Sequence, residues 1–361
     1  MLPLSKSIAS ITGIVALVLP CALTVPADAQ QKSAQKTGTR PPTVGIKGAG
    51  QMAGAAIRFG EIFGLKSGFT YQVLSARYTI DPFADFIDAT NGDEKFVVLN
   101  IAIKNNRKID NWFNSDGHVI QAVDSMNQNF EGSTHIQASK PGEPFSPTLK
   151  PGQGLGQSAT EQVMVAVKMP QTARLVKLIL KQGREGTSEE VIRFFLADAT
   201  EAEAGGKPDP KNVIAPLPKW AEKGAIIPMG QLVPSNSFYF KLNGYSTAAK
   251  LGDAAAEEGK QWVFAEVSVK NAKQAPQAIF SFYLGDSVSQ MVLIDADGEK
   301  YPAARFVKPK RDDDAEGNLE ALEERNFRVA FQVPKNVVFK QARLGSPSHH
   351  QFLFDASMAG K

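Results

Sequence analysis

The chain of 361 residues contains a single cysteine, Cys21. This cysteine lies within residues 1–29, which have the features of a secretory signal peptide. Lys6 gives a positive start, residues 11–19 are apolar, and Ala27–Ala29 form a small-residue cleavage site. Cleavage there would leave 361 − 29 = 332 residues without a thiol. We therefore expect no disulfide, no cysteine-ligated zinc site and no cysteine nucleophile in the mature protein.

An excess of one charge and a long apolar run are also missing. Forty Lys and Arg residues face 37 Asp and Glu, and removal of residues 1–29 leaves 39 − 36 = +3. This balance predicts no nucleic-acid partner. No later window approaches the ~18 apolar residues of a membrane span. We expect a periplasmic or secreted protein without a membrane span. Acylation of Cys21 is the alternative, but Pro20 stands where such a signal needs a small residue.

Several segments alternate apolar and polar residues, as strands with one buried face do. The segments with this pattern are Thr70–Tyr78, Phe96–Lys104, Val163–Met169, Leu175–Lys181, Val191–Leu196 and Trp262–Lys270. Only Ala49–Leu65, which is rich in small residues, and Asp313–Arg325, which carries an acidic run, have helical character. The pattern along the chain is therefore that of an all-β protein.

The strand pattern occurs twice. A shift of 166 positions superimposes Val97–Asn105 on Val263–Asn271, and both segments end in Lys-Asn. Val163–Pro170 matches Phe327–Pro334 at an offset of 164. Strands keep their register while loops gain or lose residues, so a drifting offset indicates an internal duplication. Two β domains of sandwich size are expected.

Residues 201–237 separate the two copies and contain six prolines. No strand pattern fits this segment, which favours a stiff linker between domains. Val213–Leu217 and Trp220 are apolar enough to pack on a neighbouring domain.

The sequence around one strand of each copy resembles a known family. Gly92–Asn105 and Glu258–Val263, followed by Asp295–Tyr301, are similar to the bacterial extracellular immunoglobulin-like (telokin-like) domain family of unknown function. The first copy departs from the pattern at its hairpin, where Asn127 stands in place of Gly298. The resemblance implies two tandem immunoglobulin-like antiparallel β-sandwiches outside the cytoplasm, and it brings no catalytic residues. The predicted organisation is a signal peptide at 1–29, a polar and Gly-rich N-terminal tether at 30–66, sandwiches at 67–200 and 237–356, a Pro-rich linker at 201–236 and a C-terminal tail at 357–361.

Two motifs have the spacing of ligand sites. Gly48–Ala53 satisfies the glycine pattern of a dinucleotide-binding turn. Lys47 interrupts the preceding strand, however, and no further βαβ alternation follows, so a small-residue leader is favoured. Asp295–Glu299 could present carboxylates to a cation, but the remaining ligands of a calcium loop are missing. Asp297-Gly298 between apolar flanks instead predicts a hairpin turn.

Charged, histidine and aromatic residues give weaker signals. Arg311–Glu316 is predicted to be a solvated loop whose charges neutralise each other, with a cation or partner contact as the alternative. Surface or turn positions are favoured for the four histidines, and Trp112 and the segment Phe280–Tyr283 are expected mainly in the core. The histidines are His118, His135, His349 and His350.

The sequence therefore predicts a non-enzymatic binding or structural module of the bacterial cell envelope. Its expected partner is an envelope or extracellular protein, contacted through sheet edges or loops. A glycan or small ligand bound in a cleft between the domains, near Trp112 or Trp220, is the alternative, and an envelope hydrolase is less favoured. No catalytic, cofactor or metal residue is assigned, and a cation near Asp295–Asp297 stays open.

Overall fold

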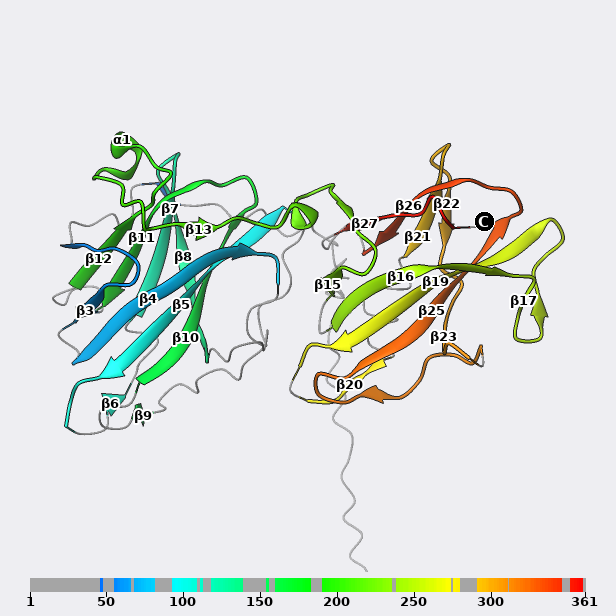
Figure 1. The fold of residues 1–361 in the computed structure, drawn as a ribbon, viewed down its shortest axis with the longest axis horizontal. Coiled ribbons are helices and arrows are strands. Elements are labelled where there is room, and N and C mark those ends of the chain that lie inside the picture. The colour runs from blue at the N-terminus through cyan, green and yellow to red at the C-terminus, as the bar shows by residue number, and fades with distance from the viewer. Residues whose placement is uncertain are drawn as a thin grey trace, which may run out of the picture. The chain divides into compact units, whose positions relative to one another are not determined.

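The structure is a computed structural model, in which the strands of each half lie side by side in packed sheets (Figure 1). Apart from one short α-helix and one turn of 3-10 helix, the named elements are strands, so the expected all-β class is confirmed. The structure describes residues 46–47, 55–65, 68–81, 93–108, 111–112, 118–138, 154–155, 160–182, 190–235, 238–273, 275–279, 291–310, 312–345 and 351–359.

The N-terminal sandwich is one continuous path of paired strands that folds into two layers. The path runs β13-β4-β5-β10-β8-β7-β11-β12-β2, while β3 pairs with β4 and β1 with β8. The strands are β1 (Ile46–Lys47), β2 (Ala55–Ala56), β3 (Ile62–Gly64), β4 (Phe69–Thr79), β5 (Glu94–Asn105), β6 (Asn111–Trp112), β7 (His118–Asp124), β8 (Gln128–Ala138), β9 (Gly154–Leu155), β10 (Thr160–Pro170), β11 (Leu175–Gln182), β12 (Glu190–Phe195) and β13 (Ile214–Ala215).

Strand β8 passes from one layer to the other. Its first half pairs with β7, and its second half pairs with β10 from Gly132 onward. A Cβ atom on Gly132 would lie 2.8 Å from the backbone oxygen of Ile120, so no side chain fits at the crossover. The strand can therefore close the sandwich at this corner because glycine lets two backbones approach.

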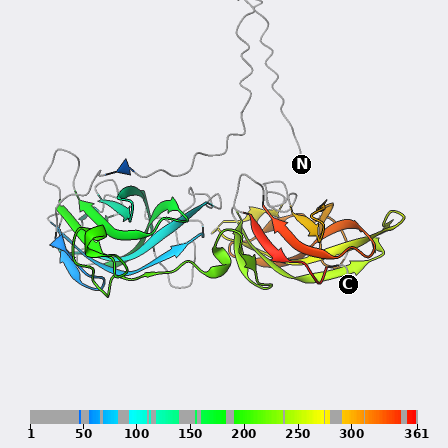
Figure 2. The same cartoon turned by 90° about the horizontal axis from the view of Figure 1, so that it is seen from above.

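The C-terminal sandwich has two five-stranded sheets, ordered β15-β16-β19-β25-β23 and β14-β27-β26-β21-β22. Figure 2 shows this sandwich from above, with the red strands β26 and β27 in one layer and the yellow-green strand β16 in the other. Its strands are β14 (Ile226–Ile227), β15 (Leu232–Ser235), β16 (Phe238–Ala248), β17 (Lys250–Leu251), β18 (Ala254–Ala255), β19 (Lys260–Asn271), β20 (Gln277–Ala278), β21 (Val292–Asp295), β22 (Lys300–Pro302), β23 (Arg305–Val307), β24 (Asn318–Leu319), β25 (Glu324–Pro334), β26 (Phe339–Leu344) and β27 (Phe352–Asp355).

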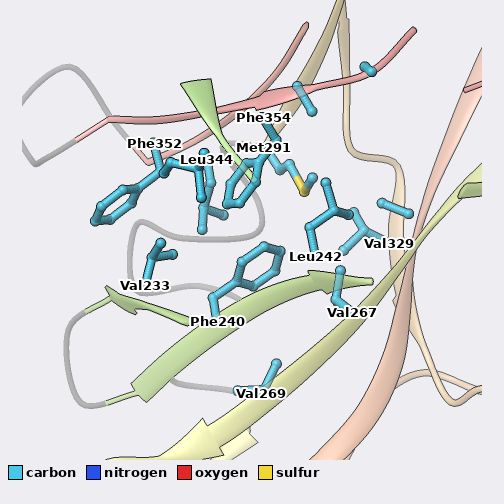
Figure 3. Close-up of a cluster of buried hydrophobic side chains, with 14 of the residues drawn as sticks. Val233, Phe240, Leu242, Val267, Val269, Met291, Val329, Leu344, Phe352 and Phe354 are labelled. Atoms are coloured by element: carbon cyan, nitrogen blue, oxygen red, sulfur yellow. The ribbon is translucent and has the colours of Figure 1, made fainter. Parts of the chain in front are cut away.

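The core of the C-terminal sandwich is filled from both sheets. Phe240 rises from β16 toward Phe354 on β27, with 5.8 Å between ring centroids, and Met291 lies close by (Figure 3). Phe240 and Phe354 are fully buried. Each sheet therefore has one buried apolar face that packs against the other sheet.

Pairing order and register agree between the central strands of the two sandwiches. Pro170 pairs with Glu94 as Pro334 pairs with Lys260. The strand pair β4–β5 carries a bulge after Val73, and β16–β19 carries one after Leu242. The Gly60 amide donates to the Val73 carbonyl at 2.9 Å, as the Gly230 amide does to Leu242 at 2.7 Å. The offsets seen in the sequence therefore correspond to equivalent positions in space.

The segment between the two sandwiches differs from the expected strandless linker. It contains α1 (Glu201–Ala204), the 3-10 helix η2 (Lys219–Ala221), and the strands β13, β14 and β15. Asn212 is buried, its Oδ1 accepts from the Phe59 amide at 2.6 Å, and its Nδ2 donates to the Phe195 carbonyl at 2.9 Å. Trp220 packs against the core of the C-terminal sandwich, as expected. Two-residue strands show no period, so the sequence pattern could not reveal them.

Both predicted helices are wrong within the described residues. The described part of Ala49–Leu65 forms β2 and β3, which pair with the N-terminal sandwich although they lie in the predicted tether. In Asp313–Arg325, Gly317 (φ 92°) and Leu322 (φ 61°) have left-handed backbone conformations, which end any helix. That segment instead holds the short strand β24.

Candidate functional site

The candidate site is the outer edge of β16. Strand β15 covers only the first part of this edge, because its pairing ends at Lys241. In the part of the chain that the structure describes, no strand pairs with residues 243–248 on this side. Asn243, Ser246 and Thr247 are exposed. The outward-facing backbone groups within this run of six residues therefore have no described partner strand.

The equivalent edge of the N-terminal sandwich is occupied. Strand β13 pairs in parallel with β4, with Ile214 opposite Ala76 and Ala215 opposite Arg77. Through the common register of their partner strands, Ala76 corresponds to Tyr245 and Arg77 to Ser246. The same edge position is thus filled by the chain itself in one sandwich and has no partner strand among the described residues in the other.

Other outer edges are short. Strands β2 and β14 have two residues each, β22 and β23 have three each, and β15 contains Pro234. Short edge strands and prolines are the usual protection against unwanted strand pairing. The open part of β16 contains no proline and no charged side chain. It therefore differs from these protected edges.

Tyr245 lines the open edge and is held in place from the opposite sheet. Its hydroxyl donates to the Asp355 carbonyl at 3.2 Å, and its ring packs against the core cluster. Burial, followed by the negative charge of Asp355, raises the pKa of Tyr245 above its ordinary value. The tyrosine is therefore neutral over the whole physiological range. On the neighbouring position, Ser246 donates to a carboxylate oxygen of Glu266 at 2.6 Å.

A polar crevice of about 820 Å³ lies between the β17–β18 hairpin and the loop after β23. Arg305 donates from Nε and Nη2 to Asp314 Oδ1 at 3.0 and 2.8 Å, and Arg328 donates to Asp312. The Gly252 amide donates to Asp312 Oδ2 at 2.9 Å, which ties the loop to the hairpin. Asp312 and Asp314 are therefore paired with arginines of strands β25 and β23, whereas the sequence predicted that the charges of residues 311–316 neutralise each other.

An apolar pocket of about 410 Å³ adjoins the same loop. Phe327 forms part of it, and the aliphatic stems of lysine and arginine side chains line the rest. Its residues are Lys308, Pro309, Lys310, Glu316, Arg325, Asn326 and Phe327. Two side-by-side hollows of different polarity thus flank one exposed loop.

The predicted cation position at Asp295–Asp297 is a hydrogen-bonded turn. Asp295 Oδ1 accepts from the amides of Asp297 at 3.0 Å and Glu299 at 2.8 Å, and Gly298 has φ 88°. Burial would raise the pKa of Asp295, but these amide hydrogen bonds and the Tyr301 hydroxyl together lower it below its usual range. The carboxylate is therefore used by the turn itself. Among the described residues, no group of three or more His, Asp or Glu side chains is placed to hold a metal ion.

The N-terminal sandwich repeats this turn with one polar contact fewer. Asp124 Oδ1 accepts from the amides of Met126 at 2.9 Å and Gln128 at 2.8 Å, and Asn127 has φ 62°. In the other copy the Tyr301 hydroxyl donates to Asp295 Oδ2 at 3.1 Å. The residue in register with Tyr301 is Phe130, and Asp124 Oδ2 is buried without a hydrogen-bond partner among the described residues.

Replacing Phe130 by tyrosine should therefore stabilise the protein. The new hydroxyl would reach the unpartnered Asp124 oxygen, and one such hydrogen bond raises the free energy of unfolding by about 1 kcal/mol. Urea unfolding of Phe130→Tyr against the parent chain measures this gain. The gain should shrink in an Asp124→Asn background, and a loss of stability in Phe130→Tyr would contradict the equivalence of the two turns.

Lys95 is a buried lysine of the N-terminal sandwich. Its Nζ lies 4.1 Å from the centroid of the Tyr78 ring, and burial lowers the pKa of Lys95 to about 8. Burial also raises the pKa of Tyr78 to about 12. The attraction between a cation and the face of an aromatic ring offsets part of the hydration that the cation loses on burial. This contact accounts for a buried lysine at the start of β5.

Several residues singled out from the sequence lie wholly or partly outside the described residues. The glycine motif at 48–53, Phe280–Tyr283, Arg311, His349 and His350 are among them. For Trp112, His118 and His135 only the backbone is described, in strands β6, β7 and β8. The open edge of β16 was not singled out from the sequence. No local pattern in the sequence marks this edge, because it is defined by the lack of a described neighbouring strand.

Comparisons with known proteins give weak similarities to solved structures. No protein-family model matches the chain, and no curated protein matches it. An uncharacterized beta-sandwich protein from Clostridium difficile 630 is 13% identical, covering 42% of this chain and 98% of its own, with a TM-score of 0.30. A conserved hypothetical protein from Bacillus anthracis is 11% identical, covering 35% and 94%, with a TM-score of 0.26.

A third neighbour is described as a "putative lipoprotein" from Bacillus subtilis. It is 9% identical, covering 61% of this chain and 74% of its own, with a TM-score of 0.25. At these scores the similarities carry no functional argument. Within the residues that the structure describes, no helix has the length and apolar character needed to cross a membrane.

Proposed function

We propose that the chain is an exported, non-enzymatic binding protein of the bacterial cell envelope that holds a protein partner at the open edge of β16. The observation that carries this proposal is the run of six residues, 243–248, without a described partner strand. An exposed strand edge offers alternating amide and carbonyl groups at about 3.4 Å per residue. Only a polypeptide carries complementary groups at that spacing, which favours a protein over a glycan or small ligand.

We infer in addition that the two sandwiches are immunoglobulin-like copies that arose by duplication. The support is their strand order. In the N-terminal sandwich β4-β5-β10-β8 and β12-β11-β7 follow the order that immunoglobulin-like sandwiches use for their two sheets, and the C-terminal sandwich has the same order in β16-β19-β25-β23 and β27-β26-β21. The shared bulges and turns point the same way.

A crosslinking pull-down from an envelope extract tests the binding function. The bait is residues 30–361, and the control bait carries Leu99→Asp and Phe240→Asp, which place charges in both cores. We expect one protein to be enriched in stoichiometric amount with the folded bait alone. If nothing is enriched above the disrupted bait, the proposed binding function is wrong.

A further inference from the structure

The N-terminal sandwich shows how a segment adds to this type of edge. Strand β13 lies parallel to β4 and uses two residues, a branched apolar Ile214 and a small Ala215. Ile214 also packs against the core cluster of that sandwich. Val213 before this pair is exposed, and Pro216 follows it. The chain therefore contains its own example of an edge ligand and of the side chains that such a ligand carries.

The outward-facing backbone groups of the open edge can be assigned. The Leu242 carbonyl accepts from the Gly230 amide, so the backbone groups of Leu242 point toward the outer edge of β16. The register shift between Leu242 and Gly244 inserts one residue, which moves the outward positions to Tyr245 and Thr247. The same reasoning from Val73 in β4 gives Ala76 and Tyr78, and Ala76 is where β13 pairs. The open edge thus presents its backbone groups at the positions that bind β13 in the other copy.

We propose, resting on the binding function above, that β16 accepts an extended segment of a partner protein in parallel orientation. The segment places a branched apolar residue opposite Tyr245 and a small residue opposite Ser246, flanked by proline. Tyr245 supplies the apolar contact, because its ring packs on the core while its hydroxyl is fixed to Asp355. No described segment of this chain occupies this position beside β16. Strand β13 is paired with β4, and Ala356 and Ala359 after β27 are buried in the core cluster.

The test uses a peptide that copies the natural example. The probe is fluorescein-labelled DPKNVIAPLP, residues 209–218 of this chain, titrated into residues 30–361 and followed by anisotropy. Thr247→Pro removes one outward amide and places a ring on the edge, a change that edge strands tolerate. The matched control, Thr247→Val, keeps the amide. We expect saturable binding to the parent and to Thr247→Val, and about tenfold weaker binding to Thr247→Pro.

Orientation is tested separately. The mature chain has no cysteine, so Lys250→Cys gives one labelling position just beyond the end of β16. A quencher there should quench a fluorophore on the C-terminal end of the peptide more than one on its N-terminal end, since a parallel segment ends near residue 250. Stronger quenching from the N-terminal end would overturn the parallel arrangement. A peptide with aspartate in place of its isoleucine should not bind.

Other outcomes are equally decisive. Equal peptide affinity for Thr247→Pro and Thr247→Val, or no binding to the parent chain, would overturn the edge assignment. If a partner protein is pulled down equally by both variants, the binding function is supported but the binding site is not the edge of β16. Self-association of residues 30–361 that Thr247→Pro abolishes would make a second copy the occupant, against the proposal. Circular dichroism of both variants shows whether they are folded.

Discussion

Replacing Phe240 by alanine is expected to lower the free energy of unfolding of the C-terminal sandwich by about 3–5 kcal/mol. The side chain is fully buried between the two sheets and contacts Phe354, so its removal leaves a cavity that the surrounding strands cannot close. Urea unfolding followed by tryptophan fluorescence measures the loss, because Trp220 and Trp262 both pack in the C-terminal sandwich.

The same variant examines whether the two sandwiches unfold separately. Their main core clusters are built from different strands, so amide exchange should accelerate in β16, β19 and β25 and stay unchanged in β5 and β10. Leu99→Ala, in the N-terminal core, should show the reverse pattern. Equal acceleration in both halves would show that the chain unfolds as a single unit. Phe240→Leu is the conservative control, with a cost below about 1.5 kcal/mol.

The second large effect is expected at Asn271, the last residue of β19. Its side chain is fully buried, and Nδ2 lies within 2.8–3.1 Å of the carbonyls of Ala275, Leu319 and Glu320. Its Oδ1 accepts from the Lys273 amide at 2.9 Å. Asn271→Ala removes all of these hydrogen bonds from a fully buried position, so we expect a loss of about 2–4 kcal/mol in urea unfolding.

Asn243 provides the control for this prediction. It is exposed and donates one hydrogen bond, to Ser268 Oγ at 2.8 Å, so Asn243→Ala should cost at most about 1 kcal/mol. Asn271→Asp retains the acceptor but has no amide hydrogens, and it should be no better tolerated than alanine. Equal stability of Asn271→Ala and Asn243→Ala would mean that the carbonyls around Asn271 find other partners.

Asn271 also illustrates what sequence patterns can predict. The Lys-Asn ending of both copies marked equivalent strand ends, and the structure places both asparagines in fully buried positions where Oδ1 accepts from the amide two residues on. Likewise, Asp297-Gly298 between apolar flanks predicted a hairpin turn, and Asp124 forms the same turn with Asn127 instead of glycine. These features depend on contacts between residues close in the sequence, so a local pattern is sufficient to find them.

Features that depend on distant partners were not predictable. The acidic segment that begins at Asp312 has the composition of a helix. Its carboxylates, however, bind Arg305 and Arg328, which lie on two strands outside the segment. Strands β13 and β14 are two residues long and exist because β4 and β27 offer them an edge. The candidate site is itself an edge that lacks such a partner, and a sequence contains no local sign of a missing neighbour.

The parallel pairing of β2 with β12 and of β14 with β27 has a mechanical consequence. In each sandwich a short strand near its beginning runs in the same direction as a strand near its end and is hydrogen-bonded to it. Tension applied at the two ends of a copy would then act along these strands in opposite directions. All hydrogen bonds between the two strands would then bear the load at the same time. In an antiparallel hairpin pulled from its ends, by contrast, the bonds open one after another. Each sandwich is thus built so that stretching the chain loads its closing strand pair in shear.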